Sequence, residues 1–125
     1  MGIKLLIVDD SHVVHAMVEK SFAMAGVEFE RIHHAYNGQE GLAILAEEPV
    51  DLVLSDIHMP VMDGVEMIET MKRDPALTSI PVVIISTEGS KKRIDHLIQI
   101  GIADFIRKPF TPEKLKDLIS LWIGA

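Results

Sequence analysis

Short apolar runs alternate with helical patterns five times along the chain, and this alternation restricts the fold more than any other feature. The runs lie at 3–8, 29–36, 50–55, 81–86 and 104–108. Three of them are nearly continuous Val, Ile and Leu, as expected for strands buried on both faces. The run at 29–36 is more mixed and is typical of an edge strand. The alternation predicts a parallel sheet with helices on both faces.

Cap residues mark where the helices between these runs begin. Asn37 with Glu40, and Asp63 with Glu66, have the spacing of an N-cap and the residue three positions later. The expected helices cover 12–25, 38–48, 64–73, 91–100 and the segment after Thr111. In the last two helices we expect these side chains to point inward: Ile94, Leu97, Ile98, Leu115, Leu118, Ile119 and Trp122.

The strand order follows from this pattern. The fold class is α/β, and we expect a (βα)5 doubly wound, parallel five-stranded sheet with the flavodoxin-like order 2-1-3-4-5. At 125 residues the chain is expected to be a single domain over 1–125. In this order strands 1 and 3 are neighbours, and ligands bind beyond the carboxyl ends of the strands at that point.

Composition excludes several classes of function. The net charge of -7 argues against binding to nucleic acid or to an anionic membrane surface. The absence of Cys excludes disulfides and thiolate metal sites. There is no signal peptide and no apolar run of about 18 residues, so we expect a cytoplasmic protein.

Charged and hydroxyl side chains follow four of the expected strands. Strand 1 ends at Asp9 and Asp10, strand 3 at Asp56, strand 4 at Ser86 and strand 5 at Lys108. Adjacent strands lie about 4.8 Å apart, so strand 5 is about 10 Å from strand 3 and a lysine can cross most of that gap. We therefore expect Lys108 to reach the carboxylates.

This set of groups suits phosphoryl chemistry. Three carboxylates packed together repel one another, which should raise the pKa of one of them. A hard divalent cation relieves that repulsion, and oxygen ligands suit Mg²⁺ better than zinc, with Mn²⁺ as an alternative. A cation and an ammonium group around one carboxylate bind phosphoryl groups. Asp56 is central and is the best candidate for the nucleophile.

Taken singly, each group has a structural explanation. Asp9 and Asp10 could cap the first helix, Asp56 could form an Asx-turn, and Ser86 could belong to an ordinary turn. Lys108 could be solvated. The joint pattern at one sheet edge favours a functional site.

Four segments carry a family resemblance. "LLIVDDS", "DLVLSDIHMPVMDG", "PVVIIST" and "DFIRKPF" resemble the signature segments of the receiver domain of two-component response regulators. The resemblance covers 1–125 and leaves no region for an output domain, so the nearest type is the stand-alone, CheY-like regulator.

The resemblance implies a role for each site residue. Asp56 would accept a phosphoryl group from the phosphohistidine of a histidine kinase, and Lys108 would pair with a phosphoryl oxygen. Asp10 and Asp56 would bind Mg²⁺ by side chain, Asp9 through water and His58 through its backbone carbonyl.

Further residues are implied as parts of a switch. Ser86 and Phe105 would move on phosphorylation; they stand where Thr and Tyr are common in the family. His58 and Glu88 occupy positions that tune the lifetime of the phosphate. The resemblance places a partner face on helix 4, strand 5 and helix 5, with Lys91, Ile94 and Phe105.

Two other functions compete with this one. A Mg²⁺-dependent phosphatase with an aspartyl nucleophile, like the haloacid dehalogenases, has a second Asp two residues later, where this chain has His58. An FMN binder needs a Ser/Thr/Gly phosphate loop after strand 1, where this chain has Asp9 and Asp10. We therefore expect no enzyme activity beyond self-phosphorylation and autodephosphorylation.

The expected partners are proteins. They are a sensor histidine kinase or phosphotransfer protein and an unknown downstream target, with no nucleic acid and no membrane, and the chain is expected to be monomeric. His12 and His15 are expected at surface and rim positions. His33 and His34 should point to opposite faces of their strand.

Overall fold

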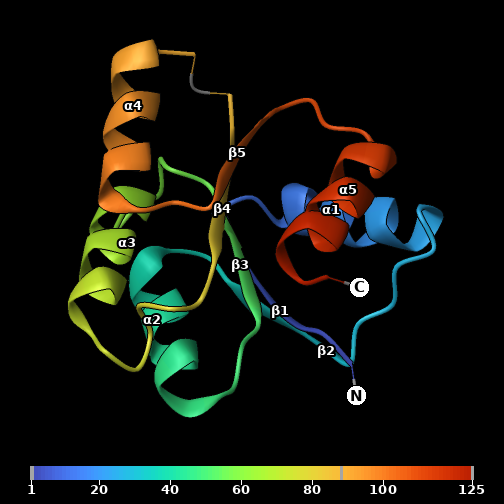
Figure 1. The fold of residues 1–125 in the computed structure, drawn as a ribbon, viewed down its shortest axis with the longest axis horizontal. Helices are drawn as coiled ribbons and strands as arrows, with labels where there is room; N and C mark the ends of the chain where they lie inside the picture. Colours follow the sequence, from blue (N-terminus) through green and yellow to red (C-terminus); the bar gives the residue numbers. More distant parts are fainter. Residues whose placement is uncertain (1, 88, 125) are drawn as a thin grey trace.

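The computed structural model describes residues 2–87 and 89–124, which form five strands and five helices in strict alternation (Figure 1). The strands are β1 (Lys4–Val8), β2 (Arg31–Ala35), β3 (Leu52–Ser55), β4 (Val82–Ser86) and β5 (Asp104–Arg107). The helices are α1 (His12–Met24), α2 (Gly38–Glu47), α3 (Gly64–Arg73), α4 (Lys91–Ile100) and α5 (Pro112–Trp122). Within the described ranges, no helix combines the length and the hydropathy needed to span a membrane.

The strands form one parallel sheet in the order β2-β1-β3-β4-β5, which confirms the predicted topology. The mixed strand β2 lies at an edge, as its polarity predicted. Helices α2, α3 and α4 cover one face of the sheet, and α1 and α5 cover the other (Figure 1). Because all strands are parallel, each crossover leaves from the same sheet edge, where the carboxyl ends of the strands meet.

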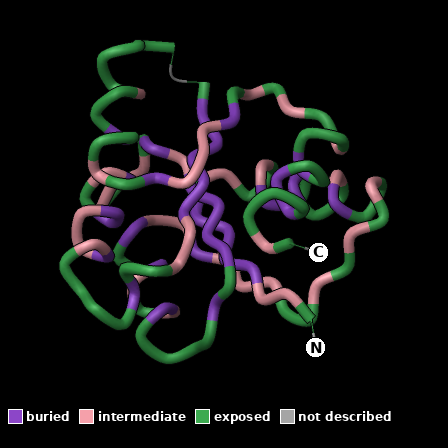
Figure 2. Tube along the Cα trace, viewed as in Figure 1, coloured by how far each residue is buried: buried purple, intermediate pink, exposed green. Residues whose placement is uncertain are grey.

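Two hydrophobic cores lie on the two faces of the sheet, and strand alternation divides the side chains between them. In β1, Leu5 and Ile7 pack on the side of α1 and α5, whereas Leu6 and Val8 pack on the side of α2, α3 and α4. The central strands are accordingly the most continuously buried part of the chain (Figure 2). The sheet is therefore a rigid base for groups at its edge.

Each helix begins at a side-chain cap. The five N-cap residues are Ser11, Asn37, Asp63, Ser90 and Thr111, each of which accepts a hydrogen bond from a backbone N–H three residues later. The cap of α1 is Ser11 and not one of the two aspartates before it. Both aspartates can therefore point into the sheet edge.

Two side chains expected to point inward are exposed to solvent, Ile98 more than Trp122. Ile98 is 58% exposed and Trp122 is 39% exposed, although Leu97 and Leu118 on the same helices are buried. The Trp122 indole N–H donates to Asp104 Oδ2 at 3.3 Å. A helix near the sheet edge has a neighbouring helix on one side only, so its buried stripe is narrower than the apolar pattern predicted.

Candidate functional site

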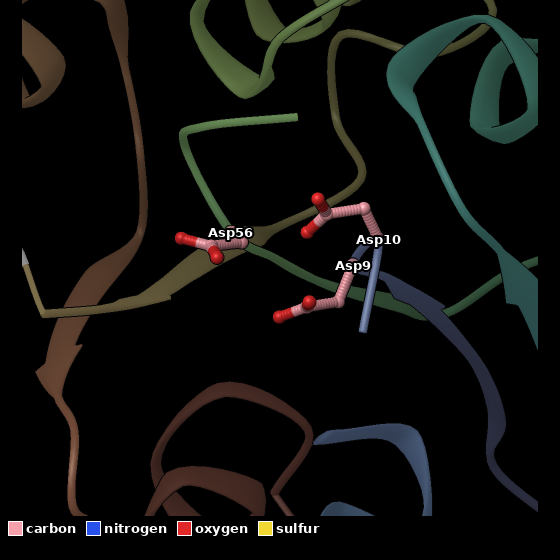
Figure 3. Close-up of side chains that lie close together, drawn as sticks. All are labelled: Asp9, Asp10 and Asp56. Carbon is pink, nitrogen blue, oxygen red and sulfur yellow. The ribbon is translucent and has the colours of Figure 1, made fainter. Parts of the chain in front are cut away.

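Three carboxylates meet at the carboxyl ends of β1 and β3. One oxygen from each of Asp9, Asp10 and Asp56 lies within 4.8 Å of the others (Figure 3). The sheet brings them together because Val8 and Ser55 are paired in register, so the residues that follow them are neighbours. The Asp56 N–H also donates to the Val8 carbonyl at 2.9 Å. Asp9 is buried, Asp56 is half-buried and Asp10 is exposed, so the cluster opens to solvent on one side.

Lys108 reaches this cluster from β5, as the sequence predicted. Its Nζ lies 3.3 Å from Asp56 Oδ2 and 3.2 Å from Asp9 Oδ2. Its backbone N–H donates to the Ser86 carbonyl at 2.9 Å, which ties the ends of β4 and β5 together. The Lys108–Pro109 peptide bond is cis. The ammonium group therefore bridges two of the three carboxylates.

The Asp56 carboxylate is held at both oxygens. Oδ1 accepts a hydrogen bond from the Ile57 N–H at 2.7 Å, and Oδ2 faces Lys108. The Ser55 hydroxyl donates to the Asp56 carbonyl at 2.8 Å. The side chain is thus oriented before any ligand binds.

The surroundings of Asp9 shift the pKa of its carboxyl group. Burial raises the pKa of Asp9 above its ordinary value, while the Ser11 N–H and the Lys108 ammonium lower it and the Asp56 charge raises it. The sequence predicted a raised pKa from repulsion; the direction is confirmed, but desolvation is the larger cause. A nearby cation would favour the charged form of this carboxylate.

The donor set fits a hard divalent cation. All three side chains offer oxygen ligands, and the exposure of Asp10 leaves room for coordinated water. The Asp9 carboxylate already accepts the Ser11 N–H at 2.9 Å and contacts Lys108. The Asp56 carboxylate has the same two kinds of contact. Asp10 and Asp56 are, however, more exposed than the buried Asp9, which favours them for direct coordination.

The predicted switch residues Ser86 and Phe105 lie on β4 and β5. Ser86 ends β4 and is buried, and Phe105 in β5 is half-buried against the core beneath α4. His58 is exposed in the loop after β3. Glu88 lies outside the described residues.

The predicted partner face combines one charged side chain, Lys91, with two apolar side chains, Ile94 and Phe105. Lys91 is exposed at the start of α4, and Ile94 is half-buried one turn later. Phe105 lines a groove that continues along Arg107 to the start of α5.

Gly64 is a site residue that the sequence analysis did not single out. A Cβ at this position would overlap the Asp56 carbonyl oxygen and lie 3.1 Å from the Ile57 Cα. The Gly64 N–H donates to the Ile57 carbonyl at 2.8 Å. One sequence signal could have identified it. Gly64 is the first residue of α3, directly after the cap Asp63, and most other residues form helices more readily than Gly. Its small size lets α3 begin against the backbone of the central aspartate.

We expect Gly64→Ala to lower the free energy of unfolding by about 1–3 kcal/mol, because backbone atoms must move to admit the methyl group. Urea unfolding measures this change. Gly89→Ala is the matched control, since its Cβ would meet only the flexible end of Arg107, at 3.6 Å. Equal stabilities of the two variants would contradict the close approach as the reason for this glycine.

A buried histidine also contacts the cluster, contrary to the expectation of a rim position. His15 is 4% exposed, and its Nε2 lies 2.8 Å from the Asp9 carbonyl oxygen. Burial lowers the pKa of His15, which favours the neutral imidazole. Sequence spacing placed this residue on α1 but could not show that this side of α1 faces the end of β1.

Comparisons with known proteins agree with one another. The sequence model of the response regulator receiver domain matches residues 5–120. The chain is 32% identical to the probable chemotaxis protein CheY of Rhizobium etli, over 98% of this chain and 94% of that protein. It is 30% identical to chemotaxis protein CheY1 of Helicobacter pylori, over 98% of both. The structure of the chemotaxis response regulator CheY4 of Vibrio cholerae superposes with a TM-score of 0.84 at 30% identity, covering 97% of this chain and 98% of that one.

Proposed function

The chain belongs to the response regulator receiver domain family, and we propose that it accepts a phosphoryl group on Asp56 and signals through phosphorylation-controlled protein contacts. The observation that carries this proposal is the position of Lys108. Its ammonium group lies 3.3 Å from a half-buried carboxylate that also stands beside two further acids. A solvated lysine or a simple turn would not require this arrangement.

The proposed reaction moves one phosphoryl group. Asp56 Oδ2 attacks the phosphorus of a phosphohistidine, an O–P bond forms, the P–N bond breaks and the histidine leaves with its electron pair. The Ile57 N–H holds Oδ1, so Oδ2 beside Lys108 is the oxygen we assign as nucleophile. Lys108 then pairs with a phosphoryl oxygen and offsets part of the added negative charge.

Receiver domains bind Mg²⁺ at an acidic cluster, and the residues here fit that ion. We propose Asp10 and Asp56 as side-chain ligands, Asp9 as a ligand through water and the His58 backbone carbonyl as a further ligand, with Mn²⁺ as an alternative ion. Bound there, the cation supplies charge neutralisation for the carboxylates and the incoming phosphoryl oxygens.

One experiment tests this function against the phosphatase and the FMN binder. Acetyl phosphate with Mg²⁺ should label the protein once, at an acid-labile group, with negligible turnover of the phosphodonor. Intact-mass analysis and phosphate release measure both quantities. Rapid turnover without accumulation of labelled protein would support the phosphatase, and a flavin that copurifies would support the FMN binder; either result overturns the proposal.

The switch rests on contacts between β4 and β5. A phosphoryl oxygen would accept a hydrogen bond from the Ser86 hydroxyl, and the Lys108 N–H already bonds to the Ser86 carbonyl. Phe105 would turn further inward. Because Phe105 is half-buried already, its motion adds only part of the roughly 1.5–3 kcal/mol that full burial of such a side chain contributes.

Beryllofluoride, a phosphoryl mimic, should therefore shift the amide resonances of Ser86, α4 and β5 as well as those beside Asp56. Two-dimensional NMR with Mg²⁺, before and after addition of the mimic, measures the change. The end of α2 at Glu47, where the chain has returned to the amino ends of the strands, provides the internal reference. Shifts confined to the neighbours of Asp56 would contradict the coupling.

The proposed partners are proteins. CheY-like receiver domains typically interact with histidine kinases, and we propose a sensor histidine kinase or a phosphotransfer protein as donor. We place the downstream contact on α4, β5 and α5, including Lys91, Ile94 and Phe105. We expect the chain to work as a monomer in the cytoplasm, with no enzyme activity beyond self-phosphorylation and autodephosphorylation.

A further inference from the structure

We propose that His15 is a positioning residue for the acidic cluster: its ring N–H holds the Asp9 carbonyl group, and His34 fixes the tautomer that makes this bond. The two histidines together are called the histidine clamp below. The inference rests on the proposed function, because the cluster that the clamp positions is the proposed phosphoryl-accepting site.

The first bond of the clamp indicates which nitrogen of His15 carries the proton in this structure. His15 Nε2 is 2.8 Å from the Asp9 carbonyl oxygen, and a carbonyl oxygen can only accept a hydrogen bond. Nε2 must therefore carry the hydrogen. A neutral imidazole has one N–H, so Nδ1 of His15 presents a lone pair.

The second bond completes the assignment. His15 Nδ1 lies 2.6 Å from His34 Nδ1, so His34 must donate from its Nδ1 to the lone pair of His15. His34 Nε2 lies 3.4 Å from Glu19 Oε1 on the other side of the ring. Both nitrogens of the buried His15 ring therefore have a hydrogen-bond partner. The Glu19 carboxylate lies beyond His34.

Ring packing holds the clamp in place. The His15 ring centroid lies 4.8 Å from that of His34 and 4.5 Å from that of Tyr36, which in turn packs against His12 at 4.4 Å. His12, His15 and Glu19 come from α1, His34 from β2 and Tyr36 from the segment after it. The titratable groups near the clamp include Glu19, His12 and the Asp9 carboxylate. The clamp joins α1 to the edge strand β2 and to the end of β1.

The hydrogen-bonded Asp9 carbonyl group influences the orientation of both Asp9 and Asp10. The Asp9 N–H donates to the Ala35 carbonyl at 3.1 Å, whereas the Asp9 carbonyl turns toward α1. The peptide group between Asp9 and Asp10 is planar, so the direction of this carbonyl also sets the position of the Asp10 backbone. Asp9 is thereby held at its N–H, carbonyl and carboxylate. Asp10 is exposed, and the orientation of the Asp9–Asp10 peptide group restricts the positions that the Asp10 carboxylate can reach.

Nitrogen–proton NMR of the metal-free protein tests the clamp directly. His15 should appear as one neutral tautomer protonated at Nε2, and His34→Phe should produce a mixture of His15 tautomers. A proton on Nδ1 of His15 in the unmodified chain would overturn the assignment. An unmixed Nε2 tautomer in His34→Phe would overturn the role of His34.

Mg²⁺ affinity, measured by calorimetry, tests the positioning role. His15→Leu should weaken Mg²⁺ binding by about tenfold, the effect expected when a group that orients a ligand is lost. His15→Gln should restore affinity to within about threefold, because its amide N–H can replace the Nε2 donor. Phe22→Leu is the control: Phe22 is buried on the same helix and packs on Phe29, so this change lowers stability without touching Asp9.

The outcomes separate this inference from the proposed function. Equal Mg²⁺ affinity in His15→Leu and the unmodified chain overturns the positioning role, even if acetyl phosphate labels Asp56. An equal loss of affinity in Phe22→Leu also overturns it, because general destabilisation would then explain the effect. Absence of labelling in the unmodified chain overturns the proposed function, while the tautomer measurement still tests the clamp.

Discussion

Replacing Asp56 by Asn should abolish the acid-labile phosphate that acetyl phosphate and Mg²⁺ form on this protein. The amide has nearly the same size, and its oxygen can still accept the Ile57 N–H, so the local backbone should be retained. It has no anionic oxygen to attack phosphorus, so the covalent product cannot form. Intact-mass analysis after incubation with the phosphodonor measures the loss.

The matched control for Asp56→Asn is Asp95→Asn. Asp95 is an exposed carboxylate on α4, so the same chemical change there should leave labelling intact. Full labelling of Asp56→Asn would show that another group is the acceptor. Loss of labelling in both variants would point to an effect of net charge and not to the Asp56 nucleophile.

Asp10→Ala should weaken Mg²⁺ binding by at least about tenfold, because a side-chain ligand is lost and not merely a group that supports one. Asp10 is exposed and its removal opens no cavity, so the fold should be retained. Calorimetry is the appropriate measurement. Trp122 is a poor fluorescent probe, because it lies at the end of α5 and donates to Asp104.

Asp95→Ala serves as the control for this change, since it removes one exposed carboxylate from another helix. It should leave Mg²⁺ affinity unchanged. If Asp10→Ala binds Mg²⁺ as tightly as this control, Asp10 is not a ligand. An affinity lost equally in both variants would instead indicate long-range charge attraction, which added salt would screen.

The sequence by itself determined the order of the elements and most of the candidate site. Apolar periodicity and cap residues are local signals, and they predicted all five strands, all five helices and the caps at Asn37 and Asp63. The parallel topology then required the residues after each strand to share one edge. This is why Asp10, Asp56 and Lys108 could be grouped before their distances were known.

Only the tertiary structure decided which groups touch and how far each is buried. Lys108 also contacts Asp9, Gly64 leaves room for the Asp56 carbonyl, and His15 is buried against the end of β1. Ile98 is exposed although it fits the apolar pattern of α4. These features depend on how segments distant in sequence approach one another. A helical or strand period specifies a face, but the neighbour that covers that face is set by packing across the sheet.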